Sequence, residues 1–204
     1  MKKITPTLKV LVVAAAFLVL SGCNNLSRDA DASSSLLIIE SIMGTTTEDE
    51  IVAFLQSDVL RDGEAGTYIA SDVATANIMV RMVSPNPING SSQFNDVVLT
   101  NYRVTYELPT GPGTPGVDVP LPFEAVLTVN CEVDMTTAVP FVVVLEAAKQ
   151  AAPLVGLVGT TTVIEIKAKI ELFGHDLTDK PVTATGYLTI YCGDYQEAAA
   201  PSPI

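Results

Sequence analysis

The residues of this 204-residue chain best suited to covalent or metal chemistry are three cysteines and one histidine. His175 lies between Gly174 and Asp176 among turn-forming residues, and no Gly-x-Ser-x-Gly motif supplies a nucleophile for it. A single histidine also cannot build the usual histidine-rich zinc site. We therefore expect no catalytic residue, no metal centre and no cofactor, and a protein that is not an enzyme.

Acidic residues near the expected turns keep two other chemistries open. They are Asp58, Asp62, Glu64, Glu132, Asp134, Asp176 and Asp179. Carboxylates bind Ca²⁺, so Asp62, Glu64, Asp176 and Asp179 are the calcium candidates, although Asp62-Gly63-Glu64 lacks the further acids of an EF-hand loop. Two carboxylates at a set separation could also hydrolyse a glycosidic bond, which makes a hydrolase using strand-end carboxylates a third hypothesis. Solvated turn acids are the simpler interpretation.

Cys131 and Cys192 are 61 positions apart, whereas metal-binding cysteines usually come in close pairs. Both fall on the apolar parity of an expected strand. In an oxidising compartment they could form a disulfide, and closing a loop of about 60 residues would contribute roughly 4 kcal/mol. Two separate buried thiols are the alternative, because parity directs each side chain inward without making the two strands neighbours.

The third cysteine, Cys23, ends a short apolar run that follows Lys2, Lys3 and Lys9. The run, residues 10–20, is shorter than the roughly 20 residues a helix needs to cross a bilayer, so it predicts a processed export signal. Leu20-Ser21-Gly22-Cys23 resembles the lipobox of bacterial lipoproteins. An ordinary secretory signal with a cysteine nearby is the alternative.

The lipobox resemblance implies that diacylglycerol is attached to Cys23 through a thioether, that the chain is cleaved before Cys23, and that the new N-terminus is acylated. Two or more acyl chains anchor a protein stably, so the lipid bilayer is the expected partner. Asn24 replaces the aspartate that retains enteric lipoproteins in the inner membrane. We therefore expect a protein exported to the outer membrane, facing the periplasm or the cell surface.

Composition limits the remaining partners. Removing residues 1–22 takes away three lysines and no acids, which leaves 8 basic and 23 acidic residues and a formal charge of −15. That charge excludes nucleic acid, whose binding depends on Lys and Arg. We expect residues 23–34 to form the lipidated cysteine and a flexible tether, residues 35–196 one domain, and residues 197–204 a disordered tail. The oligomeric state does not follow from the sequence.

Alternation of apolar and polar residues predicts an all-β domain. Residues 163–173 and 182–192 alternate with period two around turn formers and predict a hairpin. Further strands are expected near residues 78–82, 102–108 and 119–131, and interior strands at 36–40 and 141–146. Residues 47–55 fit a capped helix or, as we prefer, an extended edge segment, and residues 145–152 fit a short helix that Pro153 ends.

About seven short strands with Gly and Pro turns indicate a single antiparallel β-sandwich of immunoglobulin-like architecture, although the chain contains no Trp. Residues 94–97, 102–106, 115–123 and 186–195 resemble a group of uncharacterised bacterial envelope proteins, which implies no activity. The leading hypothesis is a non-enzymatic, membrane-anchored lipoprotein that serves the envelope as a structural or partner-binding module. A Ca²⁺- or ligand-binding surface domain is the alternative.

Overall fold

The computed structural model describes residues 32–63, 66–84 and 92–195. The predicted signal, the lipobox with Cys23, Glu64 and the predicted tail 197–204 lie outside these ranges. The described strands are β1 (Ser35–Thr45), β2 (Ile51–Val52), β3 (Phe54–Asp58), β4 (Asp72–Met82), β5 (Val97–Glu107), β6 (Phe123–Cys131), β7 (Thr136–Val144), β8 (Ile164–Asp176) and β9 (Pro181–Gly193). The expected all-β fold is confirmed.

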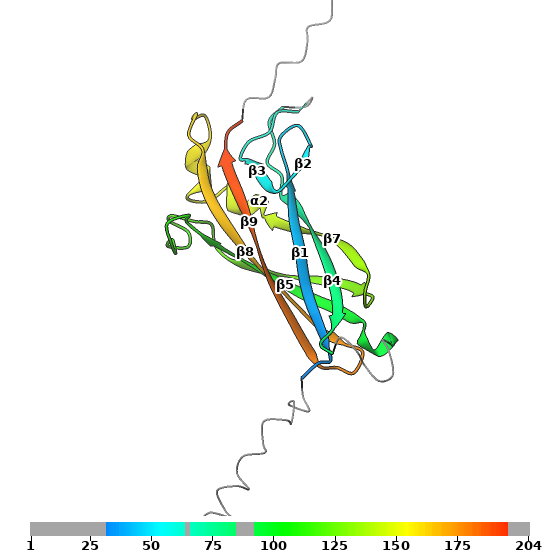
Figure 1. Ribbon diagram of the computed structural model, residues 1–204. Coiled ribbons are helices and arrows are strands. Elements are labelled where there is room, and N and C mark those ends of the chain that lie inside the picture. Colours follow the sequence, from blue (N-terminus) through cyan, green and yellow to red (C-terminus); the bar gives the residue numbers. More distant parts are fainter. Residues whose placement is uncertain (1–31, 64–65, 85–91, 196–204) are drawn as a thin grey trace, which may run out of the picture. The chain divides into compact units, whose positions relative to one another are not determined.

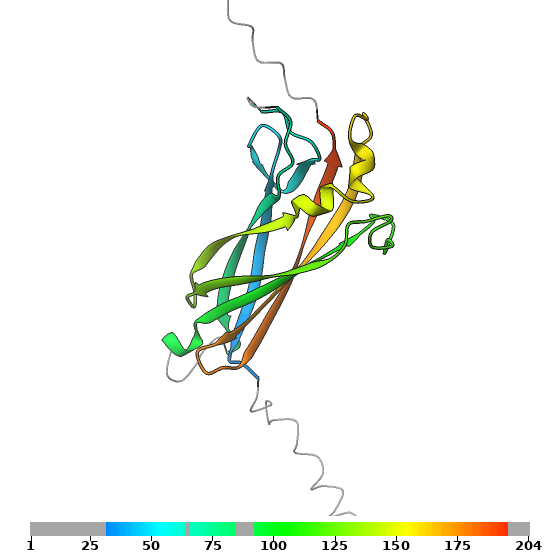
Figure 2. The ribbon, with the colours of Figure 1, turned by 180° about the vertical axis from the view of Figure 1, so that it is seen from behind.

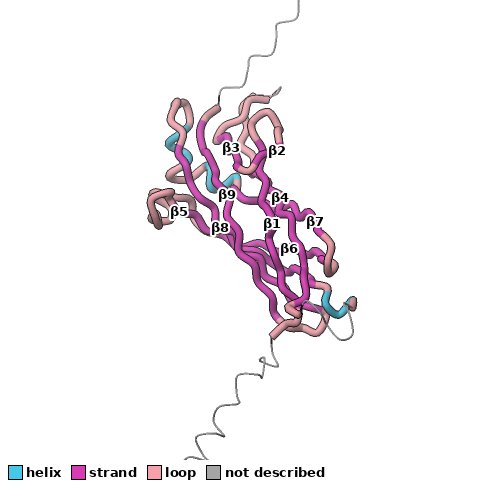
Figure 3. Tube along the Cα trace, viewed as in Figure 1, coloured by secondary structure: helices cyan, strands magenta, loops and turns pink. Residues whose placement is uncertain are grey.

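Helical structure in the described ranges is limited to the short helices η1 (Gln93–Asn95), α2 (Glu146–Lys149) and η2 (Leu154–Leu157). Figure 3 shows how few residues these helices take up beside the strands. Within the described part of the chain, helices long and apolar enough to cross a bilayer are absent. The predicted helix at residues 145–152 is present, but α2 is shorter than that range.

The strands form two sheets, ordered β2-β1-β4-β7 and β3-β9-β8-β5-β6. Neighbouring strands are antiparallel, except that β3 runs parallel to β9. The predicted hairpin is confirmed as β8 and β9, which are paired from Ile164 and Cys192 to His175 and Pro181. Figures 1 and 2 show the two strands side by side along the domain.

Buried side chains from both sheets form one hydrophobic core. On β8 the inward residues Ile166, Ala168, Ile170 and Leu172 are buried, as the alternation predicted. Tyr102 packs edge-on against Phe141, which joins β5 of one sheet to β7 of the other. The five-stranded sheet therefore turns its apolar parity towards the four-stranded sheet, while its charged parity lies on the outer face.

The preferred extended structure for residues 47–55 is confirmed. The chain leaves β1, turns, adds β2 to the border of the four-stranded sheet, and adds β3 to the border of the five-stranded sheet. The interior position expected for residues 141–146 is wrong, because β7 borders its sheet. Its apolar run reflects burial of Phe141, Val143 and Val144 in the core and does not require a strand on both sides.

The predicted flexible tether, residues 23–34, extends too far, because its last two residues contact the domain. Ser33 Oγ donates to Asp176 Oδ2 at 2.6 Å, and Ser34 Oγ accepts from Asn95 Nδ2 at 2.9 Å. Residues 33 and 34 are therefore held against the domain through the β8–β9 turn and η1.

Gly44 of β1 lies directly against Phe54 and Leu55 of β3, which leave no room for a side chain at this position. An added Cβ would lie 2.8 Å from Leu55 Cβ and even closer to the Phe54 carbonyl oxygen. We predict that Gly44→Ala lowers the free energy of unfolding by about 1–3 kcal/mol, because backbone must move to admit the methyl group. Urea denaturation of the full chain measures this.

Gly156→Ala is the matched control, since outside its own helix and its chain neighbours no atom lies within 4 Å of the Cβ it would add. Equal stability of the two variants would contradict the close approach of β1 and β3.

Candidate functional site

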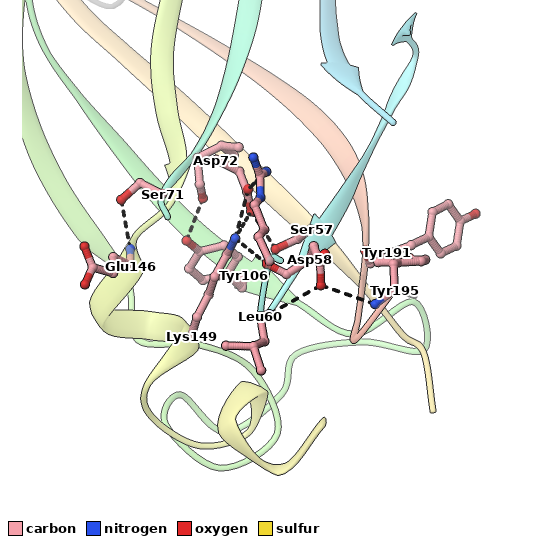
Figure 4. Close-up of polar contacts among 12 residues, drawn as sticks. Ser57, Asp58, Leu60, Ser71, Asp72, Tyr106, Glu146, Lys149, Tyr191 and Tyr195 are labelled. Carbon is pink, nitrogen blue, oxygen red and sulfur yellow. Dashed lines mark hydrogen bonds and ion pairs between the residues drawn. The ribbon is translucent and has the colours of Figure 1, made fainter. Parts of the chain in front are cut away.

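Charged side chains meet in the interior at the end of the domain where β3 and β9 finish and β4 begins. We call Ser57, Arg61, Asp72 and Lys149 the Asp72 cluster, and Figure 4 labels Ser57, Asp72 and Lys149. Ser57 belongs to β3 of the five-stranded sheet, and Asp72 opens β4 of the four-stranded sheet. Lys149 ends α2, directly after β7. The cluster therefore joins the two sheets.

The carboxylate of Asp72 is the centre of the cluster. Its Oδ2 accepts from Ser57 Oγ at 2.6 Å, and its Oδ1 accepts from Arg61 Nη2 at 2.9 Å. Lys149 Nζ lies 2.9 Å from both carboxylate oxygens and donates to the Asp58 carbonyl at 2.7 Å. An ammonium group has three donors, and these contacts offer it three acceptor atoms.

Burial explains why these contacts must be complete. The Lys149 side chain is 0% exposed and that of Asp72 is 1% exposed, whereas Arg61 keeps 33% of its side chain in contact with solvent. A buried charge costs several kcal/mol unless it is paired and hydrogen-bonded. Among the described residues, every buried side-chain nitrogen and oxygen has a hydrogen-bond partner. The cluster is therefore a closed structural network.

Burial also suppresses the reactivity of the groups around the cluster. It raises the pKa of the Cys192 thiol to about 12, with a smaller opposing effect of a hydrogen bond with Ser57. Tyr106 donates from its hydroxyl to the Val143 carbonyl at 2.7 Å, and burial raises its pKa. Burial likewise raises the pKa of the Asp58 carboxyl, although the Tyr195 and Leu60 N–H groups donate to it. At neutral pH Cys192 is thus a neutral thiol and not a nucleophile.

An open cleft of about 480 Å³ adjoins the cluster on the outer face of the four-stranded sheet. Arg61 and Asp72 belong to its wall, Asp49 borders it from the β1–β2 connection, and Ile51 borders it from β2. Its remaining lining residues are Met43, Gly44, Thr45, Ser71, Val73, Thr75 and Asn77. Besides Asp72, which is already paired with Lys149 and Arg61, the cleft presents the partly exposed Arg61 and the carboxylate of Asp49, together with hydroxyl, amide and apolar groups.

The predicted disulfide between Cys131 and Cys192 is absent, because both residues are buried free thiols. Cys131 pairs with Val97, which lies opposite Asp176 at the last residue of β8. Cys192 pairs with Ile164 at the first residue of β8. The two cysteines therefore lie at opposite ends of the sheet and on non-neighbouring strands, whereas a disulfide needs Cα atoms within about 7 Å. The alternative of two separate thiols describes the structure.

The described calcium candidates lie at two ends of the domain, with Asp176 and Asp179 in the β8–β9 turn and Asp62 at the other end. Asp176 lies at the end of β8 and Asp62 lies beyond β3, next to the end of β9, so the length of β9 separates them. Asp179 is 96% exposed in its turn, and Asp62 is exposed. Within the described ranges, no three His, Cys, Asp or Glu residues form a group that could hold a metal ion.

Asp176 is a structural carboxylate. It accepts from Ser33 Oγ, from Thr178 N and Oγ1, and from Lys180 N. Burial opposes its ionisation, but these hydrogen bonds outweigh burial and lower the pKa of Asp176 to about 2. The neighbouring His175 Nδ1 lies 3.8 Å from Asp179 Oδ1 and 3.0 Å from the Asp176 carbonyl oxygen. Neither of these two contacts of His175 involves a serine or cysteine that could act as a nucleophile.

The sequence analysis missed the main residues of the cluster. Extending the inward parity of Ile78 and Val80 back through Ala76 and Ala74 reaches Asp72, so an acid on the core face was detectable. Lys149 gave a weaker signal, as the single cation in the largely apolar stretch 138–158.

No protein-family model, no curated protein and no solved structure matches this chain.

Removing the Lys149 charge tests the structural role of the cluster. We predict that Lys149→Met lowers the free energy of unfolding by about 3–5 kcal/mol, because it leaves the buried Asp72 carboxylate without its fully buried cation. Urea denaturation of the full chain measures the change.

Lys169→Met is the control, because Lys169 pairs with Glu171 on the outer face, where it stays 30% exposed. We expect little change from it. Similar losses in both variants would contradict a special role for Asp72 and Lys149.

Proposed function

We propose that this protein is a lipid-anchored, non-enzymatic binding module of the cell envelope, fastened through Cys23. The observation that carries the proposal is the lipobox-like Leu20-Ser21-Gly22-Cys23 behind a short apolar run. The membrane is then the first partner, and the outer membrane is the proposed location. A second protein of the envelope is the partner of the folded domain.

The state of the Asp72 cluster supports a role without chemistry. Its two buried charges, Asp72 and Lys149, are paired with each other, and its neighbouring thiol has a pKa of about 12. A catalytic group needs a pKa matched to its task and access to a substrate. The ionisable groups gathered in the cluster instead connect the two sheets.

We also propose that the two sheets pack as a sandwich with immunoglobulin-like topology. The order β9-β8-β5-β6 has the connectivity of strands G, F, C and C′, and β1-β4-β7 has that of A, B and E. Cys131 and Cys192 lie on β6 and β9, in place of the B and F strands that carry the immunoglobulin disulfide. The likeness is one of architecture only.

Mass spectrometry of the full chain recovered from the membranes of a bacterial host tests the anchor. We predict that its first residue is Cys23 carrying acyl groups, and that Cys23→Ser abolishes the modification and releases the protein from the membrane. Cys131→Ser is the matched control and should stay acylated, since Cys131 is a buried thiol of the domain. An intact leader, or an unmodified thiol at Cys23, would overturn the proposal.

The cleft favours a second candidate function, the binding of a small polar ligand. Arg61 and Asp49 offer one charge of each sign, and Thr45, Thr75 and Asn77 offer hydroxyl and amide groups. This chemistry suits a zwitterion or a neutral polyhydroxy compound better than a metal ion. Small-molecule binding sites are usually concave surfaces, as this cleft is.

Titration with free amino acids and monosaccharides, followed by amide chemical shifts, tests the cleft. We predict shifts confined to β4 and to the β1–β2 connection, and their loss in Thr75→Val. Shifts scattered over the domain, or none with either class of probe, would contradict ligand binding in the cleft.

A further inference from the structure

Two exposed apolar side chains lie at the end of the domain where the described chain begins. Phe94 is 58% exposed in η1, and Leu177 is 44% exposed in the turn between β8 and β9. The register brings these two elements together, because Val97, which opens β5 just after η1, pairs with Asp176, the last residue of β8. Figure 1 shows the start of β1, η1 and this turn at one end of the domain.

Hydrogen bonds hold the entering chain between these two elements. Ser33 Oγ donates to Asp176, the residue before the exposed leucine, at 2.6 Å. Asn95, the residue after the exposed phenylalanine, donates to Ser34 Oγ at 2.9 Å and accepts from Ser35 Oγ at 2.7 Å. Both apolar side chains therefore flank the point where the chain enters. We call residues 33–35, 93–95 and 176–180 the entry end.

The length of the chain between Cys23 and the domain limits which surface can meet a membrane. Ser33 is ten residues after Cys23. Ten fully extended residues reach about 35 Å. β8 has 13 residues and runs from the far end of the domain to the entry end, a length of about 43 Å. If Cys23 carries the lipid, the far end of an upright domain cannot reach the bilayer, because the connection is shorter than the domain.

We propose that the entry end rests on the bilayer that holds the Cys23 lipid, with Phe94 and Leu177 inserted among the lipid headgroups. The inference rests on the proposed anchor and deepens it by naming the surface of the domain that meets the membrane. Anchoring keeps both side chains close to the bilayer, so a small apolar contact suffices to hold them there. Apolar side chains at an interface lie about 5–10 Å deep, at the boundary of headgroups and acyl chains.

The charges of the entry end suit a zwitterionic lipid surface. Asp179 and Lys180 bring one charge of each sign to the turn, and the carboxylate of Asp176 is buried among donors of its own chain. The whole chain carries a formal charge of −12, which opposes docking on anionic lipids. A headgroup without net charge, such as phosphatidylcholine, is therefore the lipid chemistry that fits this surface.

The two sheet faces compete with the entry end for the bilayer. The outer face of the five-stranded sheet bears the ion pairs Arg103–Glu124 and Lys169–Glu171, whose charges oppose burial in lipid. The outer face of the four-stranded sheet exposes Val73, which is 48% exposed. A domain lying on this second face is the alternative that a test must separate from an upright domain.

Single tryptophans test the orientation, because the chain contains no Trp of its own. Phe94→Trp and Leu177→Trp report the entry end. Val73→Trp is the control for the face of the four-stranded sheet, and Val155→Trp, at a 48% exposed position in η2, is the control for the far end. Each full acylated chain is reconstituted in phosphatidylcholine vesicles. Its fluorescence is compared with that in vesicles whose upper acyl chains carry bromine, which quenches Trp on contact.

We expect bromine to reduce the emission of Phe94→Trp and Leu177→Trp by at least about twofold, since both positions lie at the depth of the upper acyl chains. Val73→Trp and Val155→Trp should change little. Any other order overturns the inference, including equal quenching of all four variants, stronger quenching of either control, and no quenching at all.

The mass of each sample reports whether Cys23 is acylated, which separates this inference from the proposed anchor. An acylated chain whose entry-end tryptophans are not quenched would overturn the inference alone. A chain without acyl groups would overturn the anchor and, with it, the inference.

Discussion

The carboxylate of Asp72 is the contact on which the arrangement of this domain depends. It receives Ser57 from one sheet while belonging to the other, and it compensates Lys149 in a place that water does not reach. A helix as short as α2 has no stability of its own, so its position follows from β7 and from the Lys149 contacts. Because Arg61 binds the same carboxylate, the end wall of the cleft is fixed by the core.

A second carboxylate does comparable work at the opposite end. Asp176 gathers Ser33, Thr178 and Lys180 around the β8–β9 turn, as Asp72 gathers cations and a hydroxyl at the far end. The structural roles of Asp72 and Asp176 follow from the groups that bind their carboxylates. An acidic composition suggested solubility or calcium, but two of these acids are used to tie segments that are distant in the sequence.

The strands could be predicted because their faces differ in polarity, and β8 with β9 is the clearest case. Parity assigns a residue to a face but says nothing of which strands are neighbours. It therefore placed Cys131 and Cys192 inward correctly and left their pairing open, and it could not show that β7 borders its sheet. Asp72 was within reach of the same reasoning, whereas a lysine in an alanine-rich segment resembles one on any helix surface.

The direction in which the chain enters and leaves the domain has a mechanical consequence. Ser33 lies beside the turn from which β9 starts, and β9 finishes at the other end, where Gly193 pairs with Asp58. A force that pulls these two ends apart acts along the strands. It loads the parallel residue pairs of β3 and β9 together in shear, so they resist collectively and are not opened one after another like a zipper.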